Sequence, residues 1–107
     1  MSSYEKVRIS ESDMTSEGIM SLITKIQKAG KKCSFVVLDF KGVNIINSGG
    51  IGVLIRSHKD LQIEKGGLVI VDVSESLLAI CANSGLDRII PIYQTMDDFT
   101  ATLKKQA

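Results

Sequence analysis

The residues best placed to do chemistry lie in one short segment, Asn44-Ile45-Ile46-Asn47-Ser48-Gly49-Gly50-Ile51-Gly52. Asn47 and Ser48 are both residue types that cap the start of a helix, and glycines after a cap leave backbone N–H groups uncovered. Those N–H groups, together with the helix dipole, favour a nearby anion. The segment therefore allows two interpretations. Either Ser48 caps a helix that packs closely through its glycines, or Ser48 accepts a phosphate at a partner-binding surface.

Three other polar residues stand where a ligand or a catalytic group could be, and for each we favour a structural role. His58, the single histidine, falls on or beside the apolar stripe of a helix, without a second histidine or clustered carboxylates at metal-ligand spacing. Asp39 and Asp72 each end a buried strand, where α/β proteins bind ligands, but such aspartates more commonly accept N–H bonds from the next turn. The glycines match neither the dinucleotide-binding pattern nor the P-loop pattern. We therefore expect no metal, no cofactor and no enzymatic activity.

Composition limits the classes of function further. The chain has 107 residues, 13 basic and 12 acidic side chains and a net charge of +1, which predicts one domain over residues 1–107 and no nucleic-acid partner. The longest apolar runs, such as Phe35–Leu38, are far shorter than the roughly 20 residues of a membrane span, so we expect no membrane insertion. Two cysteines without CxxC spacing are typical of reduced thiols in a cytoplasmic protein.

Hydrophobic periodicity alternates between strand and helix along the chain. Short strands are expected at 7–9, 35–38, 68–73 and 89–93, whereas helices are expected at 19–29 and 51–61 and after Ser74 and Thr95. Asp13, Thr15 or Ser16 could cap the first helix, and Gly85 suits the left-handed residue after the third. Because the strands are apolar on both faces, the pattern predicts an α/β sandwich. Its mixed, mostly parallel sheet of about four strands would be covered by about four helices.

Four pieces of this sequence, in this order, resemble the STAS domain, and specifically bacterial anti-sigma factor antagonists. They are Val37–Phe40, Asn47–Leu54, Gly66–Val71 and Ser84–Tyr93. In that family the loop before the second helix usually has six residues of the pattern Asp-Ser-(Ser or Thr)-Gly-(Leu or Ile)-Gly. The resemblance implies a single STAS domain. The family usually begins with two strands, whereas this sequence has one clear strand there, Val7–Ile9, so its N-terminal region is short by comparison.

The resemblance also implies a partner and a switch. An unmodified antagonist binds an anti-sigma factor that is also a serine kinase, and so frees a sigma factor. Phosphorylation of the second hydroxyl residue breaks that complex, and a serine phosphatase restores it. The residues that this resemblance would place against the partner are Asn44, Asn47, Ser48, Gly49, Gly50 and Ile51.

This sequence departs from the family pattern at the critical position. Asn47 stands in the place of the aspartate, Ser48 in the place of the first hydroxyl residue, and Gly49 in the place of the phosphoacceptor. Glycine cannot be phosphorylated. Either Ser48 is the acceptor one residue earlier, or the domain binds its partner without the usual switch, which is the interpretation that we favour.

A hydroxyl residue followed by Gly-Gly raises a second resemblance, to a small STAS subunit of bacterial phospholipid-transport ABC systems. On that interpretation the domain would dock on the transporter ATPase, with Ser48 at the contact. The segment Ser84–Tyr93 is more similar to the sigma-regulatory branch, which we therefore favour. A monomer or a weak dimer is compatible with either alternative.

Overall fold

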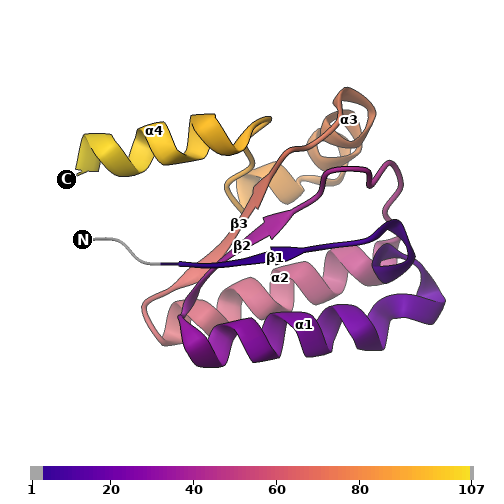
Figure 1. Cartoon of the computed structure of the whole chain (residues 1–107). Coiled ribbons are helices and arrows are strands. Elements are labelled where there is room, and N and C mark those ends of the chain that lie inside the picture. Colours follow the sequence, from indigo (N-terminus) through magenta and orange to yellow (C-terminus); the bar gives the residue numbers. More distant parts are fainter. Residues whose placement is uncertain (1–3, 107) are drawn as a thin grey trace.

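The computed structural model describes residues 4–106, along which strands and helices alternate (Figure 1). Within these residues the order of elements is β1 (Glu5–Arg8), the 3₁₀ helices η1 (Glu11–Met14) and η2 (Ser16–Gly18), α1 (Ile19–Lys32), β2 (Phe35–Asp39), α2 (Ser48–Ile63), β3 (Gly67–Val71), α3 (Glu75–Ser84), the 3₁₀ helix η3 (Leu86–Arg88) and α4 (Met96–Gln106). The α/β class that the sequence predicts is confirmed.

The sheet has the strand order β1-β2-β3, and every pairing in it is parallel. The fourth strand predicted over 89–93 is wrong, because the chain after Gly85 winds into η3 and uses Ile90 as a buried anchor. Only Ile92 bridges to Ile70 of β3, through the bonds Ile70 N–H to Pro91 O (3.0 Å) and Tyr93 N–H to Ile70 O (2.8 Å). The described sheet therefore has three strands rather than about four, and it is parallel rather than mixed.

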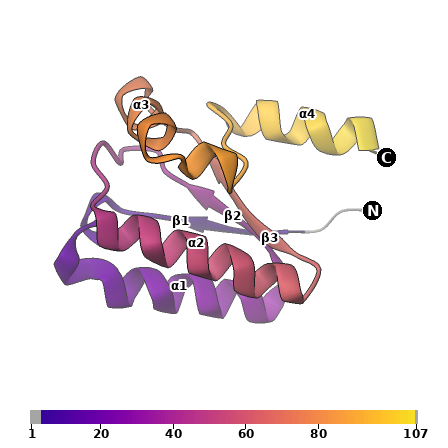
Figure 2. The same cartoon turned by 180° about the vertical axis from the view of Figure 1, so that it is seen from behind.

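Strand side chains alternate between two apolar layers of unequal size. On one face, Val36, Leu38 and Ile70 join the large core that contains the buried residues of α1, α2 and α3. On the other face, Val37, Val69 and Val71 pack with Phe99 of α4. Figures 1 and 2 show α1 and α2 side by side below the sheet and α4 above it. Because all three strands run parallel, their C-terminal ends lie at the same edge of the sheet, and the turn that leads from β2 to α2 lies at that edge.

The sequence predicts three helix boundaries correctly. The hydroxyl of Ser74 accepts the N–H of Leu77 at the start of α3, and that of Thr95 accepts the N–H of Asp98 at the start of α4. Gly85 ends α3 in the left-handed region, at φ +79°. The start of the first helix differs, because Gly18 precedes α1 without a side-chain cap, while α1 continues to Lys32. No helix within residues 4–106 is long and apolar enough to cross a membrane.

Candidate partner-binding site

The start of α2 is capped by Asn47 and not by Ser48. The side-chain Oδ1 of Asn47 accepts the N–H of Gly50 at 2.7 Å, and its backbone oxygen accepts the N–H of Ile51 at 3.1 Å. Ser48 is the first residue inside the helix, and its hydroxyl takes no part in the cap. The interpretation of Ser48 as the capping residue is therefore wrong, and its exposed side chain is available at the surface.

The capping asparagine rests on the two short 3₁₀ helices that precede α1. Its N–H donates to the backbone oxygen of Met14 (3.3 Å), and its Nδ2 donates to Oγ of Ser16 (3.3 Å). Three residues earlier, the N–H of Asn44 donates to Oε1 of Glu11 (3.1 Å). Residues 10–18, which we call the platform, therefore hold the turn before α2 from below.

The first two glycines of α2 allow this close approach. A Cβ atom on Gly49 would lie 2.8 Å from Cδ1 of Ile19, and one on Gly50 would lie 2.7 Å from Cε of the buried Met14. Both separations are shorter than side-chain contacts normally are. The two glycines therefore serve close packing of α2, Gly49 against the start of α1 and Gly50 against the platform, as one of the two interpretations of the segment expected.

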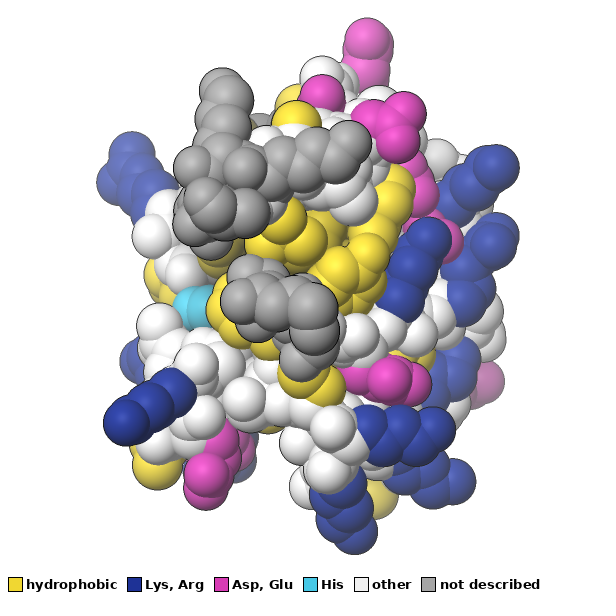
Figure 3. Space-filling model, turned by 60° about the vertical axis from the view of Figure 1, so that its left-hand side comes forward, with side chains coloured by type: hydrophobic (Ala, Val, Ile, Leu, Met, Phe, Trp, Pro, Cys, Tyr) yellow, Lys and Arg dark blue, Asp and Glu magenta, His cyan; other side chains and the backbone are white. Residues whose placement is uncertain are grey.

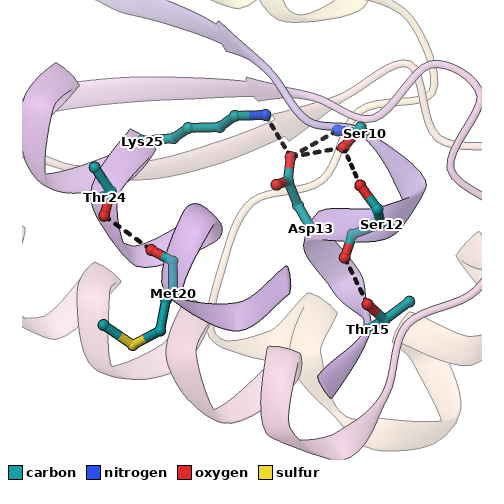
Figure 4. A network of polar contacts seen from close by, with 7 residues as sticks. All are labelled: Ser10, Ser12, Asp13, Thr15, Met20, Thr24 and Lys25. Atoms are coloured by element: carbon teal, nitrogen blue, oxygen red, sulfur yellow. Dashed lines mark hydrogen bonds and ion pairs between the residues drawn. The ribbon is translucent and has the colours of Figure 1, made fainter. Parts of the chain in front are cut away.

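The platform is itself fixed by a buried carboxylate, that of Asp13, which is 2% exposed. Its Oδ2 accepts from the backbone N–H (2.9 Å) and the hydroxyl (3.0 Å) of Ser10 and from Nζ of Lys25 on α1 (Figure 4). Burial alone would raise the pKa of Asp13, but the bonds from Lys25 and Ser10 outweigh it and hold that pKa below its ordinary value. Asp13 therefore stays ionised near neutral pH and ties η1 to α1.

This platform was not predicted from the sequence. Asp13 was one of three possible caps of the first helix, whereas it accepts bonds from Ser10, three residues before it, and from Lys25, twelve residues after it. The Ser10-to-Asp13 spacing is a signal that could have revealed the first of these contacts. The partnership with Lys25 and the bonds to Asn47 depend on tertiary structure and have no local signal.

The six expected contact residues differ in how far they are exposed to solvent. Asn44, Ser48 and Gly49 are exposed, Asn47 and Ile51 are half-buried, and Gly50 is buried. Ile45, which was not among them, is 56% exposed beside them and adds an apolar side chain. The first turn of α2 contains no acidic residue. A partner can therefore reach a polar and apolar patch, centred on Ser48, next to an uncompensated positive helix end.

The other polar candidates are engaged in structural bonds. Nδ1 of the buried His58 accepts the N–H of Leu68 at 2.9 Å, and burial lowers the pKa of His58, so the neutral imidazole joins α2 to β3. Oδ1 of Asp39 accepts the N–H of Lys41 (2.9 Å) in the next turn, as expected. Oδ1 of Asp72 instead accepts the N–H of Met96, 24 residues later, at the start of α4. Within residues 4–106 no group of three or more His, Cys, Asp or Glu side chains could hold a metal ion.

The parallel sheet, the helices on both of its faces and the exposed turn before α2 define a small α/β domain of one recognisable class. Residues 12–99 match the family model of the STAS domain, and the chain belongs to that family. The resemblance found in the sequence is thereby confirmed.

One curated relative and two solved structures are similar to the chain. The chain is 30% identical over 63 residues to the anti-sigma F factor antagonist of Paenibacillus polymyxa; the match covers 59% of the chain and 54% of the relative, so the chain spans about half the length of the curated relative. The crystal structure of TM1081, a candidate anti-sigma factor antagonist from Thermotoga maritima, superposes with a TM-score of 0.78 at 20% identity and covers 92% of this chain and 87% of that one. A sulfate transporter family protein from Wolinella succinogenes superposes with a TM-score of 0.71 at 14% identity, covering 94% and 84%. These two structures show the fold alone.

Proposed function

We propose that this STAS domain is an anti-sigma factor antagonist that acts by binding and not by catalysis. Its partner would be an anti-sigma factor with serine kinase activity in the cytoplasm, and binding would free a sigma factor. Sequence identity to the Paenibacillus polymyxa antagonist supports the class of partner. The observation that carries the proposal is the patch around Ser48, where exposed polar and apolar groups meet a helix start without an acidic residue.

Binding through this patch would be sensitive to an added negative charge at Ser48. The exposed hydroxyl lies on the first turn of α2, so a charged group there would lie inside the proposed interface. Because Gly49 provides no hydroxyl, we propose that the domain is not switched at the usual position and binds without prior dephosphorylation. Ser48 remains an alternative acceptor, and a phosphatase would then be a second partner.

The test is a calorimetric titration of the chain into the anti-sigma factor kinase of the same cell. We expect Ser48→Ala to bind like the unmodified chain and Ser48→Asp to bind at least about tenfold more weakly, because the interface would bury an added charge that no group on the partner matches. Ser76→Asp is a matched control, since it adds the same charge to the first turn of a different helix, α3. Equal binding by both aspartate variants would contradict the proposed patch.

Two further measurements separate the alternatives. Incubation with the kinase and ATP, followed by mass spectrometry, should find no phosphate on the chain; phosphate on Ser48 that disappears in Ser48→Ala would overturn unswitched binding. Binding to the ATPase of a phospholipid transporter, without binding to the kinase, would move the assignment to the transporter subunit.

A further inference from the structure

The outer face of the two helices below the sheet has a groove that is separate from the patch around Ser48. The groove has a volume of about 680 Å³ and lies between α1 and α2. Its apolar walls come from both helices: Ile23 and Ile26 from α1, and Val53 and Leu61 from α2. A Cβ atom on Gly30 would lie 3.1 Å from Cδ2 of Leu61, so the helices approach closely at one end. The groove is thus a hollow between two neighbouring helices.

Two basic side chains line this groove, and two more are adjacent to lining residues in the sequence. Lys31 and Arg56 lie in its lining, and the exposed Lys28 and Lys59 lie next to lining positions on the same helices. The lining contains one carboxylate, that of Asp60. Within the described part of the chain, none of the four cations has a carboxylate within 4.0 Å. Figure 3, which views the molecule from the left-hand side of Figure 1, shows Lys and Arg side chains over both its upper and its lower half. The groove therefore offers positive charge that the chain itself does not neutralise.

Large apolar side chains extend the same face at both ends. Met20 is 70% exposed and lies seven residues before Gln27 of the groove lining, on the same stripe of α1. Ile63 is 79% exposed and lies seven residues after Arg56, on the same stripe of α2. A spacing of seven residues keeps side chains on one face of a helix. The apolar surface is thus longer than the groove itself.

We propose that this groove is a docking site for an acidic amphipathic helix of a partner protein. The four unpaired cations call for carboxylates on the partner, and the apolar walls call for leucine-like side chains on one helical stripe. A hollow between two helices accommodates the protruding side chains of a third helix, whereas a lipid surface is better matched by a convex apolar ridge. With α1 at 14 residues, a partner helix of about 14 residues, or roughly 21 Å, would match the face. The proposal does not depend on the partner assigned to the patch around Ser48.

The experiment is a titration of the full, isotope-labelled chain followed by two-dimensional NMR. The probe is a synthetic helical peptide of about 14 residues, with leucines on one stripe and glutamates on the flanks. We expect saturable shift changes at the amides of Ile23, Val53 and Leu61, with affinity that falls as salt is raised. Reversing two charges, in Lys31→Glu with Arg56→Glu, should weaken binding at least about tenfold. A matched double reversal at two residues that do not line the groove, Lys41→Glu with Arg88→Glu, should leave the affinity within about twofold.

Each remaining outcome of the titration would overturn the proposal. Equal binding of a peptide with lysines in place of the glutamates would exclude recognition by charge. Shift changes confined to the start of α2 would place the acidic peptide at the other site. Binding of the chain to anionic phospholipid vesicles, without binding to the peptide, would assign the face to a membrane surface. Self-association that the Lys31 and Arg56 reversals abolish would assign it to a second copy of the chain.

Discussion

The starts of α2 and α3 are built on the same hydrogen-bond plan but differ in what surrounds them. At α2, Asn47 accepts the N–H groups of Gly50 and Ile51. At α3, Ser74 accepts those of Leu77 and Leu78 in the same positions. The first turn of α3 contains Glu75, which already compensates the helix dipole, whereas the first turn of α2 contains no acid.

The support beneath the two starts also differs. The cap of α2 donates to the platform through Asn47, and the platform is fixed in turn by Asp13 and Lys25. Among the described residues, the side chain of Ser74 bonds only with neighbours in sequence, Ser76 and Leu77. A helix start that is held by distant residues and lacks its own anion keeps a defined shape and has unused affinity for negative charge. This difference makes α2, rather than α3, the start suited to a partner.

The largest effect is expected from a substitution that displaces the platform. In Gly18→Ala, the new Cβ would lie 1.8 Å from the backbone oxygen of Ser12, so η1 and η2 must move apart. We expect the free energy of unfolding to fall by about 2–3 kcal/mol. Hydrogen exchange should become faster at Gly50 and Ile51 while it changes little at Leu77. Urea unfolding and amide exchange measure the two quantities.

Gly52→Ala provides the control for that substitution. Nothing lies within 4 Å of a Cβ atom at this exposed helical position, so alanine should raise the free energy of unfolding by about 0.5–1 kcal/mol. Equal acceleration of exchange at both helix starts in Gly18→Ala would show that the platform does not support α2 specifically.

The next effect concerns the ionisation of Asp13. Because the folded-state pKa of Asp13 is lowered, its contribution to stability is present above about pH 4 and is lost as the pH falls below that value. Asp13→Asn should lower the free energy of unfolding by about 2 kcal/mol near neutral pH, since Lys25 and Ser10 lose a charged acceptor. Urea unfolding between about pH 6 and pH 3 should show a steeper loss for the unmodified chain than for the variant. Parallel pH profiles would exclude this role of Asp13.

The sequence predicts a helix cap or a turn well when the contacts that fix it join residues close together in the chain, and poorly when they join residues far apart. Ser74, Gly85 and Thr95 were assigned correctly because a cap needs only residues a few positions away. The choice between Asn47 and Ser48 could not be made, since both residue types cap helices and the decision rests on bonds to Met14 and Ser16. The prediction of a strand over 89–93 was wrong. An apolar residue such as Ile90 is buried here after a 3₁₀ helix, and the sequence around it looks the same as that of a buried strand. Local patterns thus identify the turn before α2, but its support and its exposed side chain follow only from tertiary structure.

The two caps themselves should contribute unequally. Asn47→Ala removes the 2.7 Å bond to Gly50 N–H and the bond to Ser16, whereas Ser74→Ala removes the 3.2 Å bond to Leu77 N–H. We expect the free energy of unfolding to fall by about 1–2 kcal/mol for Asn47→Ala and by about 0.5–1 kcal/mol for Ser74→Ala. Asn47→Asp is the control, because it keeps the capping oxygen and should cost little. A larger loss for Ser74→Ala would reverse the comparison.

The smallest expected change in the free energy of unfolding comes from adding or removing an acidic residue in the first turn of α2 or α3. Ser48→Asp adds an acid to a first turn that has none, so it should raise the free energy of unfolding by about 0.5 kcal/mol at low salt. Glu75→Gln removes the acid from α3 and should lower it by a similar amount. Both changes should shrink when thermal or urea unfolding is repeated at high salt, because the ions screen exposed charges. If Ser48→Asp is as stable as expected and still fails to bind the kinase, the loss of binding comes from charge at the interface and not from damage to the helix. If Ser48→Asp instead destabilises the chain, the start of α2 does not have the unused affinity for negative charge that distinguishes it from α3.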